Sequence, residues 1–239
     1  MRVVHSIQQS VNIKTKALLA LILLVPAPSI GTLFGMVICP NSLAGTLIFG
    51  ASKVWLFGLP VIWLRFVDRT PFSLSPPKLG GFMTGILTGV AISSFLLSLW
   101  WLAGDALIDK RFLADKVMAI GLGTPVRYVG GALYWILVNS VLEEYVWRWF
   151  CVTQCEKLLS KRLAVVCSAL FFTVHHVVAL AVFFKPLTVL LGGAGVFIGG
   201  AIWSMMYIRY RSVWPGYLSH AIVDLCIFGI GAAIVFRLV

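Results

Sequence analysis

The feature that most constrains this chain is a succession of long apolar runs separated by short polar segments. The runs cover residues 17–38, 43–66, 81–103, 126–150, 163–184, 187–208 and 213–236. Each is close to the length of about 20 residues that a helix needs to cross a bilayer. A hydrophobic share of 60% also exceeds what one soluble core uses. We therefore expect an all-α, polytopic membrane helix bundle with about seven transmembrane helices.

The basic residues lie mainly between the apolar runs, where they predict the orientation of the chain. Lysine and arginine occur in segment 1–16 and in the short loops at 65–78, 157–162 and 209–211. The positive-inside rule places these segments in the cytoplasm. We expect a bacterial-type cytoplasmic membrane with the N-terminus inside and, with seven spans, the C-terminus outside. The first run extends well past Pro28, so we expect an uncleaved helix and not a signal peptide.

The net charge of +11 raises the question of nucleic-acid binding. A nucleic-acid site gathers its cations on one face among aromatic side chains, whereas here the cations are spread between apolar runs. Basic residues at helix ends fit anionic lipid headgroups better. We therefore expect contact with the lipid bilayer and no nucleic-acid partner.

Three polar islands interrupt the later apolar runs. They are Glu143-Glu144 with Arg148, His175-His176, and His220 with Asp224. Ionisable groups inside a span are costly, so they mark a functional site or a paired internal network. Residues 144 and 176 are symmetric about position 160, inside a charged turn, and two antiparallel helices folded there would place them at equal depth. We expect the three islands to meet.

Helical spacing assigns a different role to each side chain. Glu144 and Arg148 are four residues apart, share a face and predict an ion pair. Glu143 points about 100° away and has no local partner, which suits a general base. His220 and Asp224 are also four residues apart and share a face.

The adjacent histidines diverge for the same geometric reason. Because neighbouring helical residues point about 100° apart, we expect only one of them to face the site. We select His176, with His175 packing against a neighbouring helix or the interface.

Taken together, the islands resemble the three motifs of the CPBP family of intramembrane proteases, which includes CAAX prenyl endopeptidases and bacteriocin-immunity proteins. The motifs are Glu-Glu-x-x-x-Arg, Phe-x-x-x-His and His-x-x-x-Asn/Asp. The matching residues are Glu143, Glu144, Arg148, Phe172, His176, His220 and Asp224, the last in place of the commoner asparagine. Phe171 with His175 fits the second motif equally by spacing, but the flanking residues 168–171 align better with His176. We accordingly expect residues 126–239 to form the catalytic bundle, and residues 1–125 to supply N-terminal helices and an interfacial segment.

The resemblance implies an intramembrane endopeptidase that hydrolyses a peptide bond of a membrane-associated protein or peptide. Glu143 and His176 would activate water, and His220 with Asp224 would stabilise the oxyanion. An ionised Asp224 cannot donate a hydrogen bond, so it would have to be protonated or to act by orienting His220. Two alternatives remain: a non-catalytic immunity or scaffold protein, and a proton-coupled transporter.

We expect no cofactor, because a carboxylate and an imidazole can activate water directly. Zinc is the alternative, with Glu143, His176 and His220 as its three ligands. Using Glu143 as a ligand would leave the site without an obvious base, since Glu144 is expected to pair with Arg148. A further charge, Lys53, lies near the middle of the second run. It can snorkel to the interface, pair with a carboxylate or line the site, and the sequence does not distinguish these roles.

Overall fold

The computed structural model describes residues 2–40, 42–71 and 73–237, with side chains described from residue 12 onward. Every regular element within those residues is helical. Six of the helical segments are long and apolar enough to cross a membrane: Asn12–Ile38, Leu43–Val67, Phe82–Leu107, Lys161–Phe183, Pro186–Tyr210 and Trp214–Val235. The predicted all-α membrane bundle is therefore confirmed.

The first two spans form an N-terminal hairpin, which we define as residues 12–67. Its elements are α1 (Arg2–Leu24), α2 (Pro26–Thr32), η1 (Leu33–Ile38), α3 (Leu43–Ile62) and η2 (Trp63–Val67), where η denotes a π-helical segment. Pro26 does not break the path, because the preceding Val25 keeps helical φ and ψ of −62° and −40°. A proline in the first turn of a helix needs no backbone donor, which explains this continuity.

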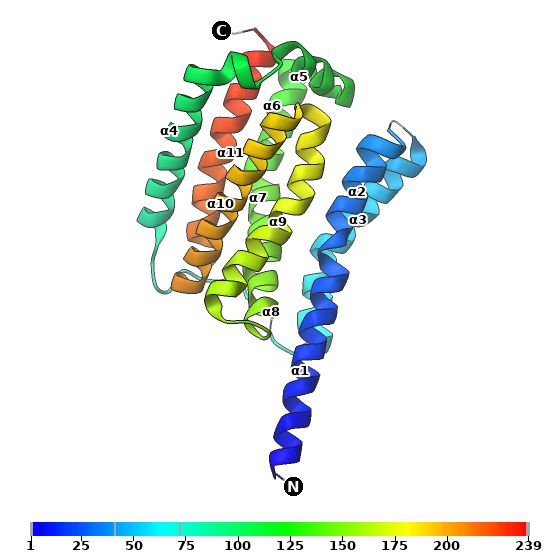
Figure 1. Ribbon diagram of the computed structural model, residues 1–239, viewed down its shortest axis with the longest axis vertical. Coiled ribbons are helices and arrows are strands. Elements are labelled where there is room, and N and C mark those ends of the chain that lie inside the picture. Colours follow the sequence, from blue (N-terminus) through cyan, green and yellow to red (C-terminus); the bar gives the residue numbers. More distant parts are fainter. Residues whose placement is uncertain (1, 41, 72, 238–239) are drawn as a thin grey trace.

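The rest of the chain forms a bundle of helices beside this hairpin (Figure 1). Its long helices are α4 (Phe82–Leu107), α9 (Lys161–Phe183), α10 (Pro186–Tyr210) and α11 (Trp214–Val235). Helix α4 packs along α11, and Gly85 and Gly89 lie directly against Pro215 and Ser219 of that helix. These small residues of α4 permit the close approach that their four-residue repeat predicts.

The remaining predicted span, residues 126–150, forms a composite helix over residues 125–156. Its segments are α6 (Pro125–Leu133), η4 (Tyr134–Asn139), α7 (Ser140–Glu144), η5 (Tyr145–Val152) and α8 (Thr153–Glu156). The residues that flank each junction keep right-handed helical dihedrals, so the segments form one rod. Wider π-helical turns often occur at functional sites, and the first polar island lies among them.

The helices alternate in direction, so that the two ends of the described chain lie at opposite ends of the bundle (Figure 1). The predicted interfacial segment is α5 (Lys110–Val117) followed by η3 (Met118–Leu122), at the end opposite to the start of α1. The connections at 68–81, 157–160 and 211–213 lie at the other end. Their basic residues therefore share one side, as predicted, while the orientation in a cell stays a prediction.

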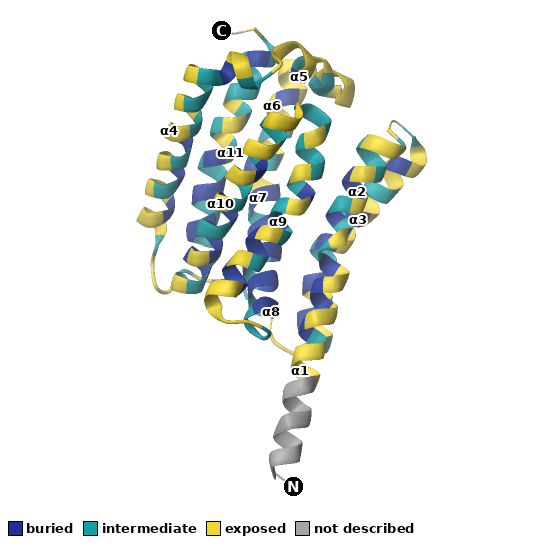
Figure 2. Cartoon of the chain, in the orientation of Figure 1, coloured by how far each residue is buried: buried dark blue, intermediate teal, exposed yellow. Residues whose placement is uncertain are grey.

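Exposed residues lie mainly on the outer faces of the helices, and buried residues gather where the bundle helices face one another (Figure 2). Many of the exposed residues are large and apolar. Trp101 is 82% exposed and Val54 is 75% exposed. So much exposed apolar surface is compatible with a lipid environment and not with water. The chain is thus an integral membrane protein.

Candidate active site

The three polar islands come from three helices and meet in the bundle interior. The carboxylates and the arginine lie on α7 and η5, the histidine pair on α9, and His220 with Asp224 on α11. His220 Nδ1 lies 3.1 Å from Glu144 Oε1, which joins the first island to the third. Ligand atoms of Glu143 and both histidines of the pair lie within 4.8 Å of one another, which joins the second. The prediction that the islands meet is confirmed.

Glu144 and Arg148 form the predicted ion pair, at 3.5 Å between Arg148 Nε and Glu144 Oε2. Both side chains are fully buried. The guanidinium lies over the rings of Phe172 and Trp203, at 4.4 and 5.4 Å from their centroids. None of its nitrogens has a hydrogen-bond partner among the described residues. The ion pair and the two aromatic faces are therefore what stabilises this charge in the apolar interior.

Glu144 also holds His220, a contact that the motif spacing did not predict. A carboxylate oxygen only accepts, so His220 Nδ1 donates to it. The imidazole stacks on Trp203, with 4.1 Å between ring centroids and 17° between ring planes. Trp203 is fixed in turn by donation from its Nε1 to Ser219 Oγ at 3.0 Å. The ring of His220 thus has a defined position and a defined tautomer at Nδ1.

Gly216 explains how Glu144 reaches α11. A Cβ at this position would lie 2.6 Å from Glu144 Oε2, which is too close for any real contact. Only glycine leaves room for the carboxylate at this point. Gly216 and Trp203 are residues of the site that sequence reasoning missed, because neither is ionisable or part of the matched motifs.

Glu143 faces away from this pair, as predicted, and toward the histidines. Its side chain is 5% exposed, and its Oε2 lies 3.9 Å from His220 Nε2. No direct hydrogen bond joins Glu143 to any of the three histidines among the described residues, and Arg148 pairs with the other glutamate. Glu143 is thus a buried carboxylate close to three imidazole rings.

The two histidines of the pair have different surroundings. His176 Nδ1 lies 2.8 Å from the carbonyl oxygen of Phe172, one helical turn earlier. The ring of His175 is buried and stacks on Trp147 of the composite helix, with 11° between planes, so it packs against a neighbouring helix as predicted. The expectation that only one histidine of the pair would face the site is wrong, because a ring nitrogen of His175 also lies within 4.8 Å of a carboxylate oxygen of Glu143.

A metal ion would find its ligands in Glu143, His175 and His176, whose ligand atoms form the only such cluster among the described residues. Two imidazoles and a carboxylate are a donor set that zinc accepts. The set predicted from the sequence contained His220 in place of His175. In the structure His220 is hydrogen-bonded to Glu144 and does not belong to this cluster.

Asp224 lies beside His220 but is not hydrogen-bonded to it. Its Oδ2 is 3.7 Å from His220 Nε2 and 2.6 Å from the hydroxyl of Ser140. That hydroxyl also lies 2.8 Å from the carbonyl oxygen of Trp135. A hydroxyl has one proton and can donate to only one of these acceptors at a time. Ser140, on the composite helix, is thus a hydrogen-bond donor within reach of Asp224, and nothing in the motif pointed to it.

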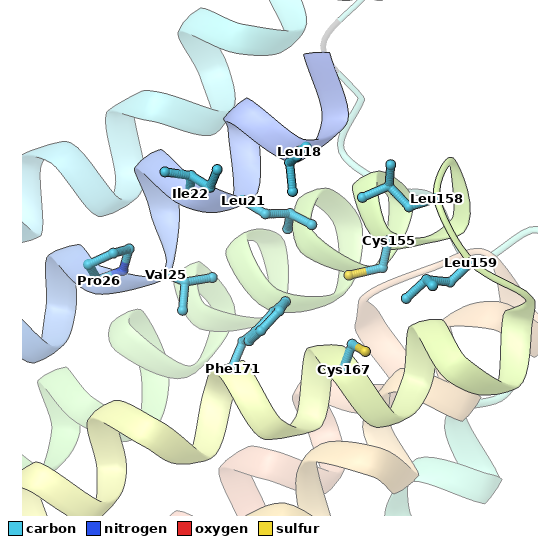
Figure 3. A pocket seen from close by; sticks show the side chains of 10 residues that line it. All are labelled: Leu18, Leu21, Ile22, Val25, Pro26, Cys155, Leu158, Leu159, Cys167 and Phe171. Atoms are coloured by element: carbon cyan, nitrogen blue, oxygen red, sulfur yellow. The ribbon is translucent and has the colours of Figure 1, made fainter. Parts of the chain in front are cut away.

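A cavity lies between the N-terminal hairpin and the bundle (Figure 3). It has a volume of about 410 Å³ and is lined by Leu18, Leu21, Ile22, Val25, Pro26, Cys155, Leu158, Leu159, Cys167 and Phe171. None of these side chains is charged, and Phe171 lies one helical turn before His175. This cavity is an apolar recess next to the site and contains none of the site's ionisable groups.

The fold and the site define an integral membrane protein with a carboxylate–imidazole cluster buried among its helices. Residues 125–226, which contain all three motifs, match the family described as type II CAAX prenyl endopeptidase Rce1-like. Comparison of the chain with curated proteins and with solved structures gave no match. The match agrees with the resemblance to CPBP proteases. At the family level the match supports an intramembrane protease that acts on a membrane-associated protein.

Proposed function

We propose that this protein is an intramembrane endopeptidase in which Glu143 and His176 activate water for attack on a peptide bond. The observation that carries the proposal is the separation of their ligand atoms, which lie within 4.8 Å of each other. Two groups that each hydrogen-bond the same water at about 2.8 Å lie roughly 4.6 Å apart. A separation within 4.8 Å is compatible with one water that contacts both the carboxylate and the imidazole.

The tautomer of His176 supports this role. A carbonyl oxygen only accepts, so Nδ1 of His176 carries a proton and donates it to Phe172. In the neutral ring the lone pair is then on Nε2, where it can bind or accept a proton. The contact also orients the ring, as the third member of a catalytic triad does for its histidine. Glu143 and His176 thus supply two bases from two helices.

His220, whose Nε2 lies 3.9 Å from Glu143 Oε2, suits the stabilisation of negative charge. Its Nδ1–H is used by Glu144, so Nε2 can donate to a developing oxyanion only in the doubly protonated ring. The carboxylates of Glu143, Glu144 and Asp224 favour that form by their negative charge. In this proposal Asp224 and Glu144 act by positioning and charging His220, which answers the difficulty that an ionised carboxylate cannot donate.

We expect Glu143→Gln to abolish cleavage, with a rate loss of at least about 100-fold, since a general base contributes of that order. The variant should insert and purify like the unaltered protein, because glutamine has nearly the same shape. The measurement is mass spectrometry of peptides after incubation of reconstituted protein with a panel of membrane-anchored substrates, prenylated and unmodified. Equal amounts of product from both proteins would refute the assignment of Glu143 as a base and would indicate a non-catalytic role for this residue.

We further propose that the reaction needs no bound metal. Glu143, His175 and His176 fit a zinc ion, which would supply a polarised water. Against a resident metal, the ligand role would remove Glu143 as a base, and Glu144 is occupied by Arg148. We expect chelator-washed, active protein to contain less than about one tenth of an equivalent of zinc, as expected for a protein without a structural or catalytic site. Stoichiometric zinc, with activity lost on stripping and restored by zinc, would contradict this.

A further inference from the structure

The apolar cavity between the N-terminal hairpin and the bundle has no part in the proposed reaction. Its lining comes from α1 and α2 on one side, and from the composite helix, the turn at 157–160 and α9 on the other (Figure 3). Along the hairpin the lining extends from Leu18 to Pro26, which is roughly 12 Å at the helical rise per residue. One leaflet supplies about half of the roughly 30 Å hydrocarbon core of a bilayer. The cavity therefore runs through most of the depth of one leaflet.

The cavity opens toward the outer surface of the protein, where the bilayer lies. Leu18 and Ile22 on its hairpin side are 52% and 56% exposed, and Leu159 on the opposite wall is 38% exposed. None of the lining residues is charged. A polar ligand would lose its hydration there without gaining a partner, so the lining favours an apolar chain that enters from the bilayer.

The basic end of the cavity has exposed cations close to its lining. Lys14 lies one helical turn before Leu18, on the same face of α1. Lys161 and Arg162 follow Leu159 closely, at the start of α9. Helices α1 and α9 both begin at this end of the molecule, so the three cations border the cavity from both of its sides (Figure 1).

The acidic residues at this end do not neutralise these cations. Among the described residues, the carboxylates at this end are Asp68 and Glu156, and both already have partners. Asp68 pairs with Lys157 at 2.7 Å, and Glu156 with Arg211 at 2.6 Å. Lipid tails are as apolar as leucine, so an apolar cavity alone would not select one lipid over another. Unneutralised cations at headgroup depth supply that selection, because they attract anionic lipids.

We propose that this cavity binds one acyl chain of an anionic phospholipid, whose phosphate is held by Lys14, Lys161 and Arg162. The lipid then bridges α1 of the hairpin and α9 of the bundle, and it fills the space between them. This binding site is separate from the proposed reaction and does not depend on whether the protein cleaves peptide bonds.

Cys167 can report whether the cavity is occupied, because its side chain lines the cavity and is partly exposed. The measurement is the rate at which an uncharged maleimide alkylates this thiol in delipidated protein in detergent, followed by mass spectrometry of peptides. With phosphatidylglycerol at ten times its Kd, about one tenth of the cavities stay open, so the reaction should slow about tenfold. Phosphatidylcholine with the same acyl chains should have little effect at the same concentration. Cys226, also partly exposed but on α11 and outside the lining, should react at an unchanged rate.

A pair of charge variants tests the headgroup contact. Lys161→Gln combined with Arg162→Gln should raise the Kd for phosphatidylglycerol about 25-fold, because each basic residue near anionic lipid contributes roughly a factor of five. The matched control is Lys78→Gln combined with Arg209→Gln, which removes the same charge from exposed residues near the same end but outside the lining. The control should leave the Kd unchanged, and equal melting temperatures of the two variants would show that both are folded.

The proposal is overturned if neither lipid protects Cys167, if both protect it equally, or if protection survives the Lys161→Gln and Arg162→Gln changes. Protection by glycerophosphoglycerol, which has the phosphate but no acyl chain, would also overturn it. So would equal slowing at Cys226, which would indicate a general effect of lipid on the micelle. Protection by S-farnesylcysteine methyl ester and not by phosphatidylglycerol would assign the cavity to a prenyl group instead.

Discussion

The N-terminal hairpin and the bundle are both built from apolar helices, but they bury different side chains. In the bundle, polar groups such as Glu144, Arg148 and Ser219 have no exposed surface. In the hairpin, the buried polar residues among those described are Thr32 and Ser52, both small. Thr32 donates to the carbonyl of Pro28, and Ser52 to that of Phe49, so both are satisfied within their own helices.

The two regions therefore depend on different kinds of contact for their stability. Packing of the bundle depends on polar partners from separate helices, so one substitution there leaves a buried group without its partner. Packing of the hairpin depends on apolar and small-residue contacts. An ion pair between Asp68 and Lys157, at 2.7 Å, then joins the end of the hairpin to the bundle. We therefore expect substitutions in the bundle to lower activity as well as stability, and substitutions in the hairpin to lower stability alone.

The largest expected effect separates the two adjacent histidines. We expect His176→Ala to lower the cleavage rate by about 10²–10⁴-fold, the range for loss of a general base. His175→Ala should cost stability through the lost stacking on Trp147, with a smaller loss of rate. Rates are measured on reconstituted protein, and melting temperatures in detergent serve as the control. If His175→Ala is inactive and His176→Ala is not, the assignment of roles is wrong by one residue.

The next effect concerns Arg148 and separates structure from chemistry. Arg148→Ala leaves Glu144 buried without its cation, which usually costs about 3–5 kcal/mol of folding free energy. We expect a lower melting temperature and a lower yield together with lost activity. Arg209→Ala, at an exposed site on α10, provides the control and should change neither. An Arg148→Ala protein that is inactive but equally stable would indicate that Arg148 contacts the substrate.

A matched pair of glycines compares the two regions most directly. A Cβ at Gly216 would meet Glu144 in the bundle, and one at Gly31 would meet Ser52 in the hairpin. Overpacking of this kind costs about 1–3 kcal/mol in either place. We expect Gly216→Ala to reduce activity more than its loss of stability explains, and Gly31→Ala to reduce stability alone. Adding Ser52→Gly to Gly31→Ala should restore the melting temperature, and an equal loss of activity in both single variants would contradict the distinction.

The sequence predicted the spans, their order and the meeting of the polar islands, because these follow from hydrophobic run length and from rise per residue. It also predicted the Glu144–Arg148 pair, since both residues lie on one helix. It did not predict that Glu144 binds His220, or that Trp203 and Ser140 support the site. Those contacts depend on how separate helices rotate and cross, and spacing within one helix does not determine that. The role of Lys53 could not be predicted from the sequence for the same reason.

The close contact between Gly216 and Glu144 also bears on how related chains are recognised. Gly216 stands four residues before His220, so the third motif extends to Gly-x-x-x-His-x-x-x-Asp in this chain. Its glycine leaves space for a carboxylate from the first motif, 2.6 Å from where a Cβ would be. A search pattern that requires this glycine together with the paired glutamates would select for compatibility between two helices. Such a pattern screens genomes for the interhelical contact itself, which three separate short motifs do not do.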